Sequence, residues 1–286
     1  MRKLKIGKKT FRWGERTYII GILNVTPDSF SDGGKYLSPD VAVGRALQMQ
    51  AEGADIIDIG GESSRPGAEP VSAEEEMKRV IPVIEEVCDK LDIPISIDTY
   101  KSKVAEKAIE FGVSIVNDIS ALRFDPDMAK VVAEHDVPIV LMHMKGTPRD
   151  MQLDPDYNDV MHEIVSFLNE RKEFAISSGI DEHKIILDPG IGFGKRTGEG
   201  IEDNCEILKR LKELKTLNQP ILVGASRKRF IGNVCGDGKQ LPVTERLEGS
   251  LAAIAVAVMN GADIVRVHDV KESKRFLRLF DMVVRQ

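Results

Sequence analysis

Eight short apolar segments recur along the chain, and each is followed by a longer segment with helical periodicity. The apolar segments do not alternate regularly with polar residues, which is typical of parallel strands that are covered on both faces. We expect strands near residues 18–23, 55–59, 93–97, 114–116, 138–142, 184–187, 220–223 and 263–267. We expect helices near residues 39–52, 72–90, 101–111, 126–135, 157–178, 203–215, 244–260 and 270–284.

Eight strands that alternate with eight helices predict an α/β fold of the (β/α)8 TIM-barrel type. A length of 286 residues is compatible with two domains, but barrels of this kind reach that length as one domain. We therefore expect residues 1–286 to form one domain, in which residues 1–16 form a short N-terminal β-hairpin ahead of the barrel. A doubly wound open sheet is the competing fold.

The composition argues against several classes of protein. A formal net charge of −6 disfavours a general nucleic-acid surface, which needs clustered basic charge. Three widely spaced cysteines, Cys88, Cys205 and Cys235, do not fit a disulfide framework and favour a reducing compartment. The basic N-terminus has no apolar run behind it, and no apolar stretch is long enough to cross a bilayer. We expect a cytoplasmic protein with neither a nucleic-acid nor a membrane partner.

Polar or ionisable residues follow every one of the eight predicted strands, whereas the connections from helix to strand are less distinctive in their polar residues. Because the active sites of barrels lie at the carboxyl ends of the strands, we expect one site assembled from these eight loops. Donors and cations suited to an oxyanion such as phosphate occur at four of these positions. They are Asn24, Arg65, Arg266 and His268.

A second set of strand-end residues consists of Asp98, Asn117 and Asp188, with no adjacent histidine or cysteine. Two carboxylates can serve as a general acid and base, as metal ligands, or as acceptors for the N–H groups along the edge of a flat heterocycle. In the third case an apolar side chain such as Phe193 or Met142 would cover the face of the ring. The residues alone leave these three possibilities open.

Several motifs together closely resemble the dihydropteroate synthase family. They are GILNVTPDSFSDGG at 21–34, GGESSRPG at 60–67, SIDT at 96–99, DPGIGFGK at 188–195, SRK at 226–228 and RVH at 266–268, in this order along the chain. The resemblance implies a homodimeric barrel that joins 6-hydroxymethyl-7,8-dihydropterin diphosphate to 4-aminobenzoate. The products are 7,8-dihydropteroate and pyrophosphate, in folate biosynthesis, and sulfonamides target this reaction.

The resemblance also implies roles for individual residues. Asp98, Asn117, Asp188 and Lys228 match the pterin-binding set, and Met142, Phe193 and Gly224 match positions that pack near the ring. Asn24, Arg65, Arg266 and His268 match the diphosphate site, with Asn24 also the contact of a Mg²⁺ cofactor. Ser64 keeps the hydroxyl of a family threonine, and Phe30 and Pro66 match the walls of the 4-aminobenzoate subsite.

Charge on the departing diphosphate and on the methylene that it leaves suggests a dissociative displacement, with Asp98, Lys228, Arg266 and His268 as the catalytic residues. A pterin-dependent methyltransferase and a non-catalytic pterin-binding barrel are the alternative functions. Arg229 stands where many family members have serine, which leaves the contact of the benzoate carboxylate open. The segment 196–204 looks longer than the usual connection and receives no role, whereas Glu62 is expected to hold the second loop together.

Overall fold

Eight parallel strands form a barrel in the computed structural model, which describes residues 3–26, 39–65, 67–198 and 201–285. Around the sheet, the order is β11-β12-β3-β4-β5-β6-β7-β8. A parallel bridge between Leu187 and Ile221 joins its two edges, and Leu187 N donates to Pro220 O at 3.0 Å. The strands are β3 (Tyr18–Asn24), β4 (Ile56–Gly60), β5 (Ile95–Asp98), β6 (Ile115–Asp118), β7 (Ile139–Met142), β8 (Ile185–Asp188), β11 (Leu222–Val223) and β12 (Ile264–Val267). The barrel prediction is confirmed.

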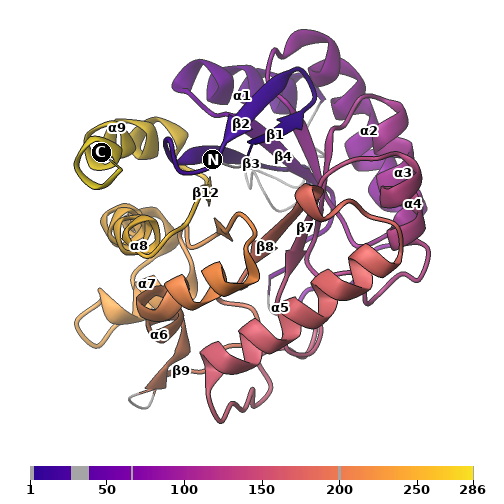
Figure 1. The fold of residues 1–286 in the computed structure, drawn as a ribbon. Coiled ribbons are helices and arrows are strands. Elements are labelled where there is room, and N and C mark those ends of the chain that lie inside the picture. Colours follow the sequence, from indigo (N-terminus) through magenta and orange to yellow (C-terminus); the bar gives the residue numbers. More distant parts are fainter. Residues whose placement is uncertain (1–2, 27–38, 66, 199–200, 286) are drawn as a thin grey trace.

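Helices surround the strands in Figure 1. They are α1 (Pro39–Glu52), α2 (Ala73–Lys90), α3 (Ser102–Glu110), α4 (Met128–Glu134), α5 (Val160–Ser177), α6 (Asp203–Arg210), α7 (Arg229–Val234), α8 (Leu247–Met259) and α9 (Val270–Val284). Short 3-10 turns lie at Glu182–Lys184, Leu211–Leu217 and Val243–Glu245. The helix predicted at 203–215 is therefore α6 continued by a 3-10 turn. Helix α7, which has only six residues, is absent from our predictions because it is too short to show helical periodicity.

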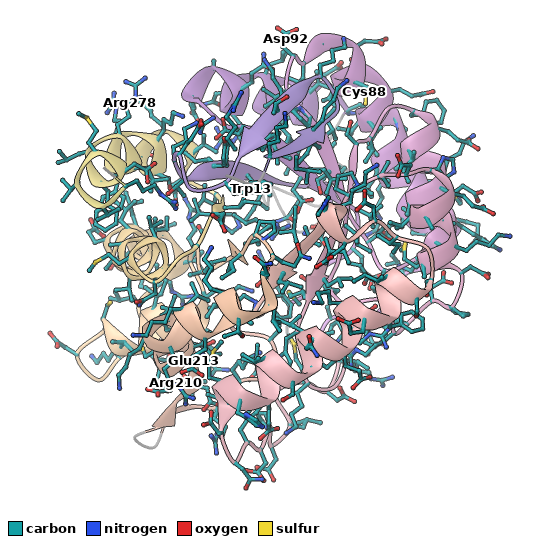
Figure 2. The ribbon with its side chains drawn as sticks, in the orientation of Figure 1. Trp13, Cys88, Asp92, Arg210, Glu213 and Arg278 are labelled. Atoms are coloured by element: carbon teal, nitrogen blue, oxygen red, sulfur yellow. The ribbon has the colours of Figure 1, made fainter. Side chains whose placement is uncertain are left out.

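The predicted N-terminal hairpin is present as β1 (Lys3–Ile6) paired with β2 (Lys9–Arg12). Its apolar side chains cluster with the inward-facing residues at the amino ends of the barrel strands. The cluster includes Leu4, Ile6, Phe11, Trp13, Tyr18, Ile20, Ile56, Ile115, Val140, Ile186, Leu222 and Ile264. Figure 2 labels Trp13, which belongs to this cluster, and Cys88 at the periphery. The hairpin thus closes one end of the barrel and leaves the other end for a site.

The inside of the barrel changes from apolar to polar along the strands. Successive side chains of a strand point to opposite faces, so inward positions recur every second residue. On β4 the inward pair is Ile56 at the apolar end followed by Asp58, and on β12 it is Ile264 followed by Arg266. Side chains that point outward pack against the helices and form the main hydrophobic core. The polar end of the barrel is the carboxyl end, as the sequence predicts.

A short additional hairpin follows β8 on the outside of the barrel. Strands β9 (Thr197–Gly198) and β10 (Ile201–Glu202) form a small antiparallel hairpin between β8 and α6, within the segment to which the sequence assigned no role. Among the described residues, no helix is both long and apolar enough to cross a membrane.

Candidate active site

The strand register places the predicted site residues at one level around the mouth of the barrel. Asn24 lies opposite Gly60, Gly60 opposite Asp98, and Asp98 opposite Asn117. Two strands further on, Met142 lies opposite Asp188. These residues lie at or within one position of the ends of six strands, and four of the strands place a polar side chain at this common rim.

Arg266 is the centre of a charged network at the base of this rim. Its Nε donates to Asp58 Oδ2 at 2.6 Å, and its Nη2 donates to Asp98 Oδ2 at 2.7 Å. Asp58 Oδ2 also accepts from Asn117 Nδ2 at 3.0 Å. Because a carboxylate can only accept, the NH2 group of the Asn117 amide, and not its oxygen, faces Asp58. Arg266, predicted as a diphosphate contact, thus already neutralises two carboxylates.

Asp58 is the main residue that sequence reasoning missed. It is 1% exposed and lies within an apolar strand, where we treated it as part of the strand itself. A charged residue at an inward position of a buried strand is a signal that could have identified it, since such groups need partners. Its Oδ1 atom has no hydrogen-bond partner among the residues that the structure describes.

The two predicted carboxylates are held in environments that favour protonation. Burial raises the pKa of Asp98 to about 7, and the nearby Asp58 adds to this rise whereas Arg266 opposes it. Burial raises the pKa of Asp188 to about 6, against the hydrogen bond that Gly190 N donates to its Oδ1 at 2.7 Å. Raised carboxylate pKa values of this kind are concentrated at functional sites.

Lys228 and Phe193 form one wall of the mouth. The Lys228 ammonium lies 3.8 Å from the centroid of the Phe193 ring, and burial lowers the pKa of Lys228 to about 8. Phe193 and Met142 belong to a small apolar cluster with Ile119, Met144 and Met151. Close to Arg266, Gly224 leaves the strand end open, since a Cβ there would lie 3.8 Å from Arg266 Cβ. The predicted apolar cover therefore lies beside the predicted polar groups.

His268 is held as a neutral donor. Burial lowers its pKa to about 3, together with the charges of Arg266 and Arg227. Ser226 Oγ accepts from His268 N at 3.2 Å and lies 3.1 Å from His268 Nδ1. When the Ser226 proton points to Nδ1, the remaining nitrogen Nε2 carries the N–H. Of the two forms that the sequence allowed, cation or neutral donor, the structure favours the second.

The second loop is anchored through Glu62, as predicted. Glu62 Oε2 accepts from Val71 N at 3.2 Å, and Oε1 accepts from Tyr100 Oη at 2.8 Å. Lys101 also donates to Glu62, which ties the loop after β4 to the loop after β5. Ser64 is half-buried and Arg65 is exposed, and the Arg65 side chain has no polar partner among the described residues. The predicted residues Phe30 and Pro66 lie outside the described part of the chain.

Further residues near the mouth lie at different depths. His143 is buried behind Asp188, where its Nδ1 lies 3.0 Å from Lys195 Nζ. Arg229 is exposed as the first residue of α7. The segment 196–204 has a clear role after all, because Asn204 Oδ1 accepts from Gly192 N at 2.6 Å and so braces the loop after β8.

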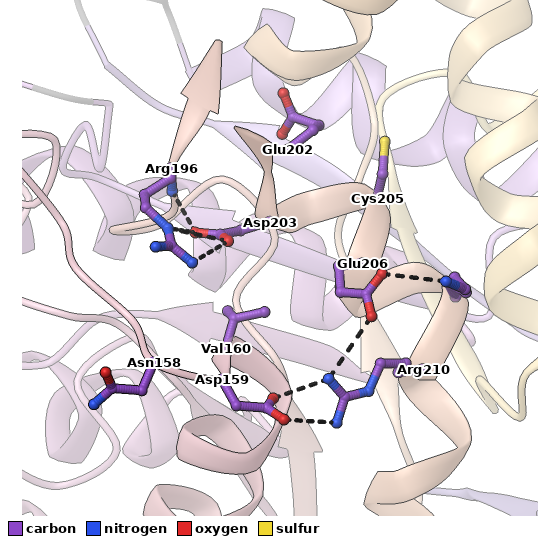
Figure 3. Close-up of a pocket in the computed structure, with 10 residues that line it drawn as sticks. Asn158, Asp159, Val160, Arg196, Glu202, Asp203, Cys205, Glu206 and Arg210 are labelled. Atoms are coloured by element: carbon purple, nitrogen blue, oxygen red, sulfur yellow. Dashed lines mark hydrogen bonds and ion pairs between the residues drawn. The ribbon is translucent and has the colours of Figure 1, made fainter. Parts of the chain in front are cut away.

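A separate cavity of about 490 Å³ lies outside the mouth, between the start of α5, the β9–β10 hairpin and α6 (Figure 3). Both of its arginines are paired with carboxylates. Arg210 donates to Asp159 at 2.9 Å, and Arg196 donates to Asp203 at 3.0 Å. These pairs leave little charge for a ligand, so we place the site at the barrel mouth. Within the described ranges, no three histidine, cysteine, aspartate or glutamate side chains are arranged to bind a metal ion.

Comparison with known proteins agrees with this geometry. The family model described as pterin binding enzyme matches residues 20–268. The dihydropteroate synthase of Clostridium beijerinckii is 49% identical over 99% of this chain and 100% of its own length. That of Bacillus subtilis is 50% identical over 94% of this chain and 90% of its own length.

Solved structures give the same result. The Xanthomonas albilineans dihydropteroate synthase with 4-aminobenzoic acid superposes with a TM-score of 0.90 at 42% identity, and covers 99% of this chain and 98% of its own. The Yersinia pestis enzyme in a sulfonamide complex also has a TM-score of 0.90, at 40% identity and 98% coverage of both chains. With its barrel, its strand-end motifs and these relatives, the chain belongs to the dihydropteroate synthase family of pterin binding enzymes.

Proposed function

We propose that this chain condenses 6-hydroxymethyl-7,8-dihydropterin diphosphate with 4-aminobenzoate by a dissociative displacement at the barrel mouth. The observation that carries the proposal is the convergence of polar groups from separate strand ends in a chain of this family. They are Asp98, Asn117, Asp188, Lys228, Arg266 and His268. A relative from Xanthomonas albilineans has been solved in complex with 7,8-dihydropteroate, the product that this reaction would form.

The pterin would bind with its polar edge against Asp188 and Asn117. A carboxylate that accepts two hydrogen bonds suits the amino and ring N–H groups of an amino-pyrimidine. Phe193 and Met142 would pack near the ring, beside Lys228. Asp98 would lie near the methylene that reacts, since it is level with Asn117 in the strand register.

In the reaction, the bond between the methylene carbon and the diphosphate oxygen breaks, and its electron pair leaves with the diphosphate. Arg266 and the neutral N–H of His268 would stabilise the charge that develops on the leaving group, together with Arg65 from the second loop. The ionised Asp98 carboxylate would favour the cation left on the pterin methylene. The amine nitrogen then forms the new C–N bond and loses a proton, so no strong base is needed before attack.

We further propose that Asn24 contacts Mg²⁺, which would neutralise charge on the diphosphate. A Cβ placed on Gly60 would lie 3.7 Å from Asn24 Oδ1, so this oxygen faces the space beside the end of β4. Mg²⁺ prefers oxygen ligands, is held by few protein groups and takes others from substrate phosphates. The lack of a three-residue cluster among the described residues therefore does not conflict with such a site. Ser64, Phe30 and Pro66 would line the 4-aminobenzoate subsite.

We also propose a cytoplasmic homodimer. The three cysteines are free, which suits a reducing compartment. Exposed apolar side chains on neighbouring helices α8 and α9 offer a surface for a second copy of the chain. They are Val256, Met259, Leu279, Met282 and Val283.

Pyrophosphate release from the pterin diphosphate tests the proposal. We expect release to require Mg²⁺ and to be accompanied by dihydropteroate when 4-aminobenzoate is present. Slow release without 4-aminobenzoate would support the dissociative order. Strict dependence of bond cleavage on the amine would refute that order, and the absence of any condensation would refute the function.

A further inference from the structure

Lys195 has a buried amino group that the proposed reaction does not use, and burial lowers its pKa to about 7. Its side chain is 1% exposed and lies directly behind the mouth, at the end of the loop that follows β8. Its Nζ donates to Phe193 O at 2.7 Å and to Gly190 O at 3.0 Å, and lies 3.0 Å from His143 Nδ1. Within the described ranges it forms no ion pair. A buried amino group is costly unless its polar atoms are hydrogen-bonded, so the contacts of Lys195 need an explanation.

The loop wraps around the Lys195 amino group because of its glycines. Gly190, Gly192 and Gly194 have φ angles of 68°, 79° and 56°, the left-handed region that favours glycine. A Cβ on Gly190 would lie 1.8 Å from His143 O, so the loop lies directly on the segment that follows β7. The Phe193 and Gly190 carbonyls turn inward to the Lys195 amino group.

His143 provides the fixed side of this arrangement. Its backbone N donates to Asp188 O at 2.9 Å, which joins the ends of β7 and β8. Its ring packs edge-on against Phe167 at a centroid distance of 4.9 Å. Burial, with the positive charge of Lys195, lowers the pKa of His143 well below its ordinary value. The neutral ring can therefore accept at Nδ1, so Lys195 Nζ has three acceptors within hydrogen-bond distance.

The two residues whose carbonyls Lys195 holds are also the two that shape the mouth. Gly190 N donates to Asp188 Oδ1 at 2.7 Å and so orients that carboxylate. The Phe193 ring lies 3.8 Å from Lys228 Nζ. From these contacts we infer that Lys195 is a positioning residue of the pterin subsite, which holds the loop 189–194 so that the Asp188 carboxylate and the Phe193 ring face the pterin. The inference rests on the proposed function, because it concerns the same site.

Lys195→Met is the direct test, since it keeps an unbranched side chain that is one atom shorter and removes the amino group. We expect the Kd for the pterin diphosphate, measured by calorimetry without 4-aminobenzoate, to rise at least about tenfold, because misplacement by about 1 Å can cost about 100-fold. The KM for 4-aminobenzoate should change far less. Lys145→Met is the matched control, because Lys145 is exposed on the same side of the barrel and donates outward to Asp156 O. It should leave both values near those of the wild type.

A second pair of variants keeps the inference testable if Lys195→Met does not fold. His143→Leu removes one of the three acceptors, whereas His143→Asn places an amide oxygen near the position of Nδ1. We expect a weaker pterin Kd in His143→Leu and recovery in His143→Asn. Folded variants that lose thermal stability but keep the wild-type pterin Kd would overturn the positioning role. Failure of the proposed function is distinct, because the wild type itself would then show no condensation.

Discussion

Arg266 Nε donates to Asp58 Oδ2 at 2.6 Å. The cation that we expect to bind the diphosphate is therefore oriented by a carboxylate that need not contact the substrate. The same oxygen accepts from Asn117 Nδ2 at 3.0 Å. Asp58 therefore couples a residue of the proposed diphosphate subsite to one of the proposed pterin subsite. Groups that orient binding residues in this way can matter nearly as much as the residues themselves.

Asp58→Asn should lower kcat/KM for the pterin diphosphate by at least about tenfold, or about 1.4 kcal/mol of transition-state stabilisation. The substitution removes the negative charge that faces Arg266. The NH2 group of the new amide is a donor, so it cannot accept from Arg266 or from Asn117. Steady-state kinetics measures the loss. Asp263→Asn is the control, because Asp263 is a buried carboxylate that accepts from Lys215 Nζ at 2.7 Å just before the amino end of the same strand as Arg266. It should affect stability but not kcat/KM to a comparable degree.

Pterin affinity should decrease as the pH falls, because the ionised form of Asp188 accepts from ligand N–H groups. Its pKa is raised to about 6. Below pH 6, the Kd should rise by about tenfold per unit for Asp188 alone. Asp188→Asn should weaken binding sharply at pH 8 and remove the step near pH 6. Titration calorimetry across this range checks it, and unchanged binding by Asp188→Asn would exclude the role.

The same raised pKa values have the opposite effect on the stability of the free protein. Between about pH 4 and about pH 7, the folded chain holds protons on Asp188 and Asp98 that the unfolded chain has released. These two groups therefore make the free energy of unfolding decrease as the pH rises through that range. In Asp188→Asn, this decrease should be smaller, which denaturant titrations at several pH values would measure.

The His268 ring should remain neutral from pH 8 to pH 5, since its pKa is lowered to about 3. In ¹⁵N spectra of the imidazole, we expect a single tautomer with the proton on Nε2. Ser226→Ala removes the hydroxyl that lies 3.1 Å from Nδ1 and should produce a mixture of tautomers. An imidazolium spectrum at pH 6 in the wild type would contradict this assignment.

Gly190→Ala should destabilise the fold by more than about 2 kcal/mol, because an L residue in the left-handed region costs about 1–2 kcal/mol before any clash. Its Cβ would also lie 1.8 Å from His143 O, a backbone atom. Gly44→Ala is the matched control, since this exposed glycine of α1 has no atom near its Cβ position. That variant should gain about 0.5–1 kcal/mol. Denaturant unfolding measures both changes, and equal effects would contradict the role of close packing.

Asn24→Ala should raise the Mg²⁺ concentration needed for half-maximal turnover by about tenfold or more. The reason is that Asn24 is the proposed protein ligand for the ion. Asn158→Ala is the control, because Asn158 is exposed outside the mouth near the separate cavity. Equal Mg²⁺ requirements in Asn24→Ala and the wild type would remove the ligand role while leaving the rest of the site intact.

Much of the barrel and its rim could be predicted from local pattern. Apolar runs identified each of the eight strands to within a few residues, because buried parallel strands need apolar side chains on both faces. The rim followed from the common direction of those strands. Helix α7 and the β9–β10 hairpin were missed because six-residue and two-residue elements carry no period that a sequence can display.

Other features depended on contacts between residues far apart in the chain. The sequence by itself determined a barrel, its polar rim and the family, because periodicity and short motifs are local properties. Only the tertiary structure decided that Asp58 holds Arg266 across 208 positions of the sequence, that His268 is neutral, and that Lys195 lies inside its own loop. Burial and pairing set the charge of a side chain, and both are properties of the assembled barrel rather than of any segment of it.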